Sequence, residues 1–107
     1  AVTAGADPEA VYQASRTGLA GSAVLDARAP MMYNRNFVPG GTIKVNHKDI
    51  TNVVKTAHAI DAPIPYTAQL YEIMQTLKVH GHLMDDHSGI VQYFETLADV
   101  VVKKPEA

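Results

Sequence analysis

A lysine and an aspartate, Lys48 and Asp49, stand side by side in a segment whose neighbours follow a helical pattern. Consecutive residues of a helix point about 100° apart, so the two side chains would diverge from one stretch of backbone. An ammonium group can bind an anionic ligand as a point charge. A carboxylate can accept a hydrogen bond from a hydroxyl group. Taken alone, such a pair is more typical of an exposed helix face than of a ligand site.

A second group of polar residues lies between His80 and His87, where three histidines and two aspartates occur within eight residues. Side chains of these types can bind zinc or another divalent ion. Their spacing, however, matches no closed structural zinc motif, and the chain has no cysteine. We therefore expect no metal site here. We expect a solvated loop in which Asp85 or Asp86 caps the following helix.

The elements that must position these residues are predicted to be helices. Asp7, Ser22 and Thr42 are all residue types favoured just before a first helical turn. Thr42 precedes an apolar stripe with helical spacing that includes Ile43, Val53 and Ile60, and Lys48 lies away from that stripe. In the first half of the chain we predict a last helical turn before Gly5, a helix from Pro8 to about Gly18, and two short turns over 23–29 that Pro30 ends. Two longer helices follow, over about 43–60 and 66–80, and Gly81 ends the second of them. The final helix has a predicted buried stripe of Ile90, Val91, Phe94, Leu97 and Val101.

The composition is that of one globular domain. The chain has 107 residues, of which 47% are apolar, and it carries a net charge of −2. That charge gives no general attraction for nucleic acid or an anionic membrane, and no apolar stretch approaches the roughly 20 residues of a spanning helix. The lack of cysteine permits a reducing compartment, and we expect a cytoplasmic protein. We predict an all-α fold, a compact bundle of about five helices that forms a single domain over residues 1–107.

Several blocks of the sequence, in this order and spacing, resemble the C-terminal helical domain of the β-hydroxyacid dehydrogenases, and within them the tartronate semialdehyde reductases. The resemblance covers nearly the whole chain. The blocks are Ala4–Val11, Gly18–Ser22 with Val24–Ala27, Arg35–Gly40, His47–Asp49 and Asp86–Ser88.

The resemblance implies a two-domain enzyme of the 6-phosphogluconate dehydrogenase-like type, with an N-terminal Rossmann domain that is absent from this chain. Hydride would pass between NAD or NADP and a small β-hydroxyacid or its semialdehyde, such as tartronate semialdehyde and glycerate. Lys48 would contact the cofactor, and Asp49 would lie against the substrate pocket. The family's catalytic lysine would lie upstream of Ala1, so we expect no catalytic residue here and an inactive fragment. The expected partners are the Rossmann domain of the same protein and further copies of it, as a homodimer or higher homo-oligomer.

The sequence departs from the family at Gly41, where the resemblance implies an aromatic residue that helps to wall the substrate site. The identity of the acid therefore stays open, and 3-hydroxyisobutyrate is the nearest competitor. From the sequence alone, two different classes of protein also stay open. One is a helical interaction module without enzymatic activity, and the second is a metal-binding helical protein.

Overall fold

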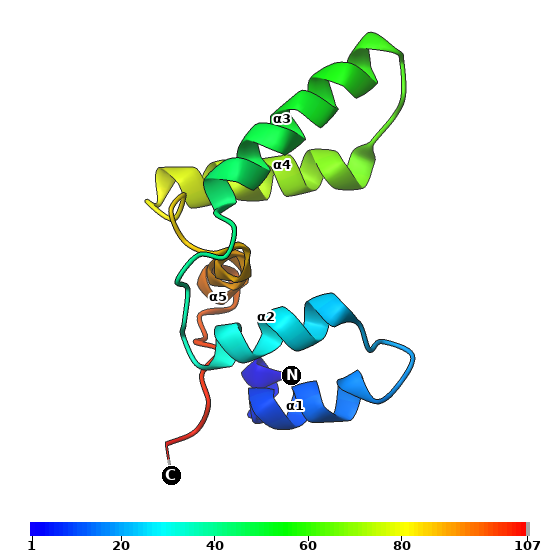
Figure 1. Ribbon diagram of the computed structural model, residues 1–107. Helices are drawn as coiled ribbons and strands as arrows, with labels where there is room; N and C mark the ends of the chain where they lie inside the picture. Colours follow the sequence, from blue (N-terminus) through cyan, green and yellow to red (C-terminus); the bar gives the residue numbers. More distant parts are fainter. Residues whose placement is uncertain (107) are drawn as a thin grey trace.

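The computed structural model describes residues 1–106, and over that range it is built of helices and loops (Figure 1). The prediction of an all-α fold with about five helices is confirmed. Within the described residues, no helix is both long and apolar enough to cross a membrane. The elements are η1 (Val2–Ala4), α1 (Pro8–Arg16), α2 (Ala23–Tyr33), α3 (Ile43–Ala59), α4 (Pro65–Val79), η2 (His87–Ile90) and α5 (Val91–Ala98), where η denotes a 3₁₀ helix.

The helices form two hairpins with a short helical segment between them. Figure 1 shows α1 beside α2 at one end, α3 beside α4 at the opposite end, and α5 in the middle. The molecule measures 51 × 32 × 26 Å, and its radius of gyration is 15.3 Å. A globular domain of this length typically has a radius of gyration of about 13 Å. The chain is therefore elongated, and much of each helix faces outward.

The predicted helix boundaries are confirmed at most positions because the caps form as expected. The side chains of Asp7, Ser22 and Thr42 each accept a hydrogen bond from a backbone N–H group in the first turn that follows. These bonds satisfy donors that have no partner within the helix. Gly5 and Gly81 follow their helices with φ of 91° and 84°, the left-handed conformation that glycine adopts most easily.

The prediction that Pro30 ends the second helix is wrong, because α2 continues to Tyr33. Proline removes one backbone hydrogen bond from a helix and crowds the carbonyl four residues earlier. Here the turn after Pro30 is held by burial. Tyr33 is buried, and its ring centroid lies 6.1 Å from that of Tyr12 on α1. The N–H of Asn34 also donates to the carbonyl of Pro30, at 3.1 Å.

The predicted buried stripe of the last helix is wrong at three of its five positions, while Ile90 and Val91 are half-buried. Phe94, Leu97 and Val101 are 51%, 69% and 59% exposed, and Val101 lies beyond the end of α5. The inward residue is Glu95, which is buried and forms an ion pair with Arg35 at 2.6 Å. A buried carboxylate needs such a partner, and this one lies sixty positions away in the sequence. In the orientation that α5 adopts, Glu95 faces inward, whereas Phe94 and Leu97 face outward.

The apolar core of the described chain is thin. It lies mainly between α3 and α4, with one contribution from the end of α2, and the remaining large apolar side chains are at least partly exposed. A core of this size leaves the rest of the fold dependent on polar contacts between loops. The buried apolar residues are Tyr33, Ile43, Ala57, Met74 and Leu77.

The most constrained polar group is the carboxylate of Asp86, which is completely buried. It accepts hydrogen bonds from Arg28 Nη1 at 2.8 Å and from the backbone N–H groups of Gly40 at 2.9 Å, Gly41 at 3.5 Å and Ser88 at 2.9 Å. These five residues, the Asp86 cluster, join α2 and the loop before α3 to the start of η2.

Burial of the Asp86 carboxylate opposes ionisation and by itself would raise its pKa. The hydrogen bonds from Ser88, Gly40 and Gly41 outweigh that effect and hold the pKa well below its ordinary value. Asp86 is therefore ionised in the folded protein at any ordinary pH. It supplies a fixed negative charge opposite Arg28.

The loop around the Asp86 cluster also fixes the beginning of α3. The backbone N–H groups of Ile43 and Lys44 donate to the carbonyls of Asp85 at 2.9 Å and Leu83 at 2.8 Å. Both donors lie in the first turn of α3, where no partner exists within the helix. The segment between α4 and η2 thereby sets the position of the helix that carries Lys48.

We predict that Asp86→Asn destabilises the protein by about 3 kcal/mol, because it leaves Arg28 beside a neutral group and removes an acceptor from buried donors. The folded-state pKa of Asp86 is depressed, so its contribution is complete above the unfolded value of about 4 and declines as the pH falls below it. Denaturant unfolding from pH 7 to pH 3 measures this. The variant should lose less stability over that range than the wild type.

Asp26→Asn is the matched control, because Asp26 also pairs with an arginine, Arg16 at 3.1 Å, but on the surface. Its effect should be much smaller, since exposed ion pairs contribute little. Equal effects of the two substitutions would contradict the central role of Asp86.

Candidate functional site

Lys48 and Asp49 lie near the middle of α3, and both side chains are exposed, at 69% and 58%. The Nζ atom of Lys48 lies 3.2 Å from Oδ1 of Asp49. An ion pair as exposed as this one contributes little to stability, because water screens both charges. The two groups are therefore held only loosely, and each can leave its partner for a ligand.

The two residues lie on different flanks of α3. Asp49 is four positions from Val45 and from Val53, so it lies in line with both along the helix. We name Val45, Val53 and Ile60 the apolar flank; the three are 48%, 48% and 70% exposed. The stripe predicted for this helix is therefore buried only in part, because its members Ile43 and Ala57 are buried whereas Val53 and Ile60 are exposed.

The apolar flank borders a shallow groove of about 360 Å³ near the end of α3. Apolar surface of this kind on a helix is commonly covered by another protein segment or a ligand. If the flank is covered, the carboxylate of Asp49 would lose water on the covered side and would then seek a hydrogen-bond donor. The groove is lined by Asn52, Val53, Thr56, Ala57, Ile60 and Ala62.

The structure explains why position 41 is occupied by glycine. A Cβ atom on Gly41 would lie 2.2 Å from Nε2 of His87, so the ring of His87 or the turn itself would have to shift to accommodate a side chain. The ring of His87 is itself held by Asn46 on α3, and the backbone N–H of His87 donates to the backbone carbonyl of Gly41 at 3.0 Å. The imidazole of His87 therefore occupies the space next to the turn before α3, where the resemblance placed an aromatic residue at position 41.

The histidine-rich loop does not gather its side chains around one point. Within the described residues, no group of three or more His, Asp or Glu side chains is placed to hold a metal ion. His82 Nδ1 contacts Asp85 Oδ2 at 3.0 Å, and Gln92 Nε2 donates to the same oxygen at 2.9 Å. Asp86 is committed to Arg28, and it caps η2 as expected for this loop.

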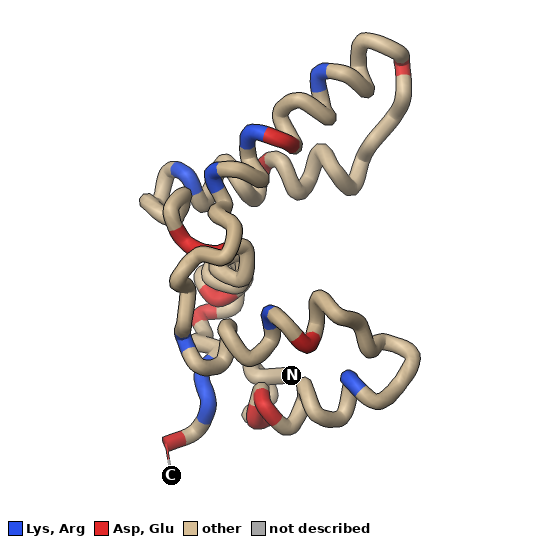
Figure 2. The backbone as a smooth tube through the Cα atoms, viewed as in Figure 1, with Lys and Arg blue, Asp and Glu red and all other residues tan. Residues whose placement is uncertain are grey.

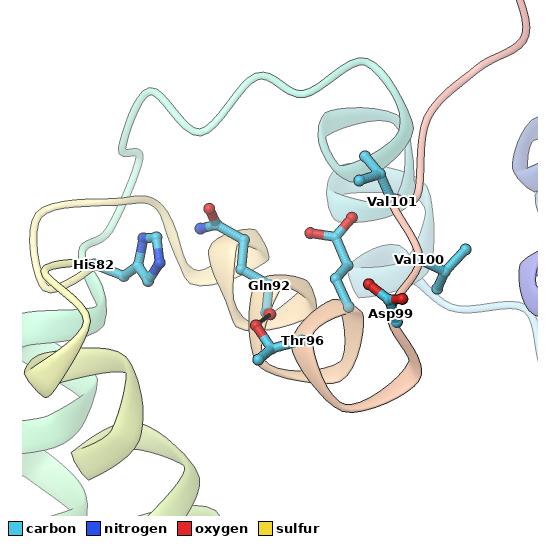
Figure 3. A pocket seen from close by; sticks show the side chains of 7 residues that line it. His82, Gln92, Thr96, Asp99, Val100 and Val101 are labelled. Atoms are coloured by element: carbon cyan, nitrogen blue, oxygen red, sulfur yellow. Dashed lines mark hydrogen bonds between the residues drawn. The ribbon is translucent and has the colours of Figure 1, made fainter.

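A polar cavity of about 370 Å³ beside α5 was not predicted from the sequence (Figure 3). The buried residue Glu95 is part of its lining, together with Gln92 and Thr96. Sequence analysis did not identify Glu95 as a buried residue, because the apolar residues around it have the spacing expected of the buried face of a helix. Its partner, Arg35, lies too far away in the sequence for any local pattern to connect the two. The cavity is lined by His82, Gln92, Glu95, Thr96, Asp99, Val100 and Val101.

A larger groove, of about 610 Å³, runs between α4 and α5. It collects the apolar residues of α5 that were expected in the core, Phe94 and Leu97, together with Ile73 and Tyr93. Neither this groove nor the polar cavity includes Lys48 or Asp49. The residues with candidate chemistry and the larger hollows of the surface therefore lie on different parts of the molecule.

Two comparisons with individual proteins relate the chain to known enzymes. It is 36% identical over 96 residues to the 2-hydroxy-3-oxopropionate reductase of Escherichia coli K12, which covers 90% of the chain and 33% of that protein. The fold matches the crystal structure of a 3-hydroxyisobutyrate dehydrogenase from Salmonella typhimurium with a TM-score of 0.80 at 19% identity, over 85% of the chain and 32% of that protein. The chain thus spans about a third of the length of each of these proteins.

A family model described as "NAD-binding of NADP-dependent 3-hydroxyisobutyrate dehydrogenase" matches residues 1–94. That range contains every helix that positions Lys48 and Asp49, as well as the Asp86 cluster. The match confirms the resemblance inferred from the sequence blocks, and the chain belongs to this 3-hydroxyisobutyrate dehydrogenase-like family of NAD-binding domains.

Proposed function

We propose that this chain is the helical half of an NAD(P)-dependent β-hydroxyacid dehydrogenase, in which Lys48 contacts the cofactor and Asp49 positions the substrate. One observation carries the proposal. In a chain of an NAD-binding family, a lysine and an aspartate lie exposed and loosely paired on neighbouring flanks of one helix. Such a pair can meet two different ligands with two different charges.

The residues around Lys48 fit a dinucleotide. The ammonium group is exposed, its one ion pair is weak, and no buried contact prevents it from reaching an anionic or hydroxyl group. When bound, NAD or NADP supplies the hydride acceptor or donor of the reaction. The proposed role of Lys48 is to hold the cofactor against α3 by charge attraction and hydrogen bonding.

Asp49 is suited to orient a small hydroxyacid or semialdehyde. Its carboxylate can accept a hydrogen bond from a substrate hydroxyl, or from the ammonium group of a catalytic lysine elsewhere in the protein. Covering the apolar flank would exclude water around it and strengthen either contact. Asp49 would then contribute by fixing the substrate in a productive orientation.

We place the catalytic acid outside this chain. Reduction of an aldehyde delivers hydride to the carbonyl carbon and a proton to its oxygen, and the proton donor must lie within hydrogen-bond reach of that oxygen. Lys44, Lys48 and Lys55 all lie on exposed helix surface, without the buried setting that tunes a lysine for proton transfer. The proposal therefore needs a second domain, for which we propose a Rossmann domain in the same protein.

The substrate that we propose first is 2-hydroxy-3-oxopropionate, also named tartronate semialdehyde, which would be reduced to glycerate. The support is the 36% identity to a reductase named for that compound. The second candidate is 3-hydroxyisobutyrate, the substrate named for the family model and for the structural neighbour. The two candidate substrates differ in polarity. We propose that the residues around Gly41 and His87 determine which of them the enzyme prefers.

The exposed apolar surface supports the proposal that this domain works inside a larger assembly. Phe94 and Leu97 line the groove between α4 and α5, and Tyr66 at the start of α4 is 85% exposed. Large exposed apolar side chains that gather in this way commonly mark an interface. We propose that the Rossmann domain and a second copy of the protein, in a homodimer or higher homo-oligomer, cover these surfaces.

For the full-length protein we predict that Lys48→Ala raises the KM for NAD(P)H about 10-fold, because a charge-assisted contact contributes roughly 1.4 kcal/mol. Asp49→Ala should leave the cofactor KM nearly unchanged. It should lower kcat/KM for the acid or semialdehyde, also by about 10-fold, because the substrate loses an orienting hydrogen bond. Steady-state kinetics with each ligand varied in turn separates the two effects.

Lys103→Ala and Glu106→Ala are the matched controls, because these residues also form an exposed ion pair, at 3.1 Å, in the C-terminal segment. Both should keep wild-type kinetics. If the variants at positions 48 and 49 also behaved like wild type, the assignment of this site would fail even though the family assignment stands.

We further predict that residues 1–107, prepared alone, neither reduce 2-hydroxy-3-oxopropionate nor gain measurable thermal stability in about 1 mM NADPH. A ligand stabilises a protein only in proportion to its binding to the folded state. Exposed lysine contacts on one side of the cofactor are too weak to bind it without the second domain. A thermal-shift titration measures this, and a rise in Tm of several degrees would show that this chain binds the cofactor by itself.

A further inference from the structure

Three lysines of α3 lie on one flank of the helix, which we name the lysine flank: Lys44, Lys48 and Lys55. Their spacings of four and eleven residues from Lys44 place them within about 40° of one another around the helix axis and spread them over about 16 Å of its length. In Figure 2 the blue segments of α3 are accordingly spaced along the whole helix. All three residues are exposed.

The lysine flank is unfavourable for the isolated helix. Lys44 stands in the first turn, where the helix dipole disfavours a positive charge, and that turn has no acidic residue. Lys44 and Lys48 are also four apart, a spacing at which like charges repel each other. Among residues 1–106, neither Lys44 nor Lys55 has an ion-pair partner. These charges therefore do not serve to stabilise the fold.

The flank also contrasts with the rest of the chain. α3 carries three lysines and one aspartate, whereas the whole chain has nine basic and eleven acidic residues. The helix that bears the candidate cofactor residue thus has a net positive charge, whereas the rest of the chain, with six basic and ten acidic residues, has a net negative charge. A line of ammonium groups on an otherwise acidic domain suits an extended ligand with more than one anionic group.

We propose that Lys44 and Lys55 are further cofactor-positioning residues, which extend the contact of Lys48 along the phosphate groups of the dinucleotide. This inference rests on the proposed function, since it takes the bound anion to be NAD or NADP. Lysine suits the role because an ammonium group on a long side chain binds phosphate as a mobile point charge. The α3–α4 interface is not disturbed, because α3 meets α4 through different residues, among them His47, which contacts Gln75 at 3.1 Å.

The test is the KM for NAD(P)H of full-length Lys44→Gln and Lys55→Gln, each compared with Lys78→Gln. Lys78 is an exposed lysine on α4, outside the flank, so its loss makes the same change in net charge. We expect each flank variant to raise the KM about 3- to 10-fold, as for one ion pair near a surface, with kcat unchanged at saturating cofactor. Lys78→Gln should keep the wild-type KM, and Lys44→Arg and Lys55→Arg should restore it.

Salt gives a second readout. Raising the ionic strength from about 0.05 M to about 0.5 M should shrink the difference between the wild type and each flank variant, because screening removes the attraction that the variants have lost. A difference that persisted unchanged at high salt would overturn a charge-based contact.

The outcomes separate the two proposals. If Lys48→Ala raises the cofactor KM while Lys44→Gln and Lys55→Gln do not, the lysine flank is not a phosphate contact and the proposed function stands. If Lys78→Gln raises the KM as much as the flank variants, the effect belongs to net charge and the inference fails. If no lysine variant, Lys48→Ala included, changes the KM, both the inference and the cofactor assignment of Lys48 fail.

Discussion

The arrangement of the described chain depends on the ionised carboxylate of Asp86. One buried anion is bound at once by Arg28 of α2, by the backbone of Gly40 and Gly41, and by Ser88 of η2. A charge removed from water is stable only when its hydrogen bonds are complete, so each of these segments is drawn to the same point. Because the apolar core is thin, this polar cluster does much of what packing does in a larger domain. It joins the α1–α2 hairpin to the α3–α4 hairpin.

The consequence for the candidate site is indirect but specific. The cluster fixes the turn at Gly41, the turn fixes the first donors of α3, and α3 carries Lys48 and Asp49. The ring of His87 packs where a side chain at position 41 would stand, so the turn and the ring constrain each other. A change at either residue would therefore be expected to move the start of the helix as well as the shape of the nearby surface.

The sequence was a good guide wherever a short-range rule decides the structure. Asp7, Ser22 and Thr42 cap helices because their side chains reach a backbone donor within a single turn. The hydrophobic pattern of the sequence predicted the wrong buried face where a long-range contact determines which residues are buried. Glu95 points inward because it pairs with Arg35, and no local spacing reports a partner so distant in the chain. The α-helical class, the family and the place of Lys48 were accessible from sequence, whereas the rotation of α5 and the polar cavity beside it were not.

The exposure of Lys48 and Asp49 is informative because the fold does not depend on their pairing. An ion pair that contributes little to stability can be broken with little loss of free energy, so the binding that we propose would require no reorganisation of the core. Asp86 shows the opposite case, a carboxylate with both oxygens committed and therefore unavailable to a substrate. The domain thus keeps two kinds of charge. Buried ions hold the helices together, whereas the charges of Lys48 and Asp49 on α3 are exposed, as the roles that we propose for them require.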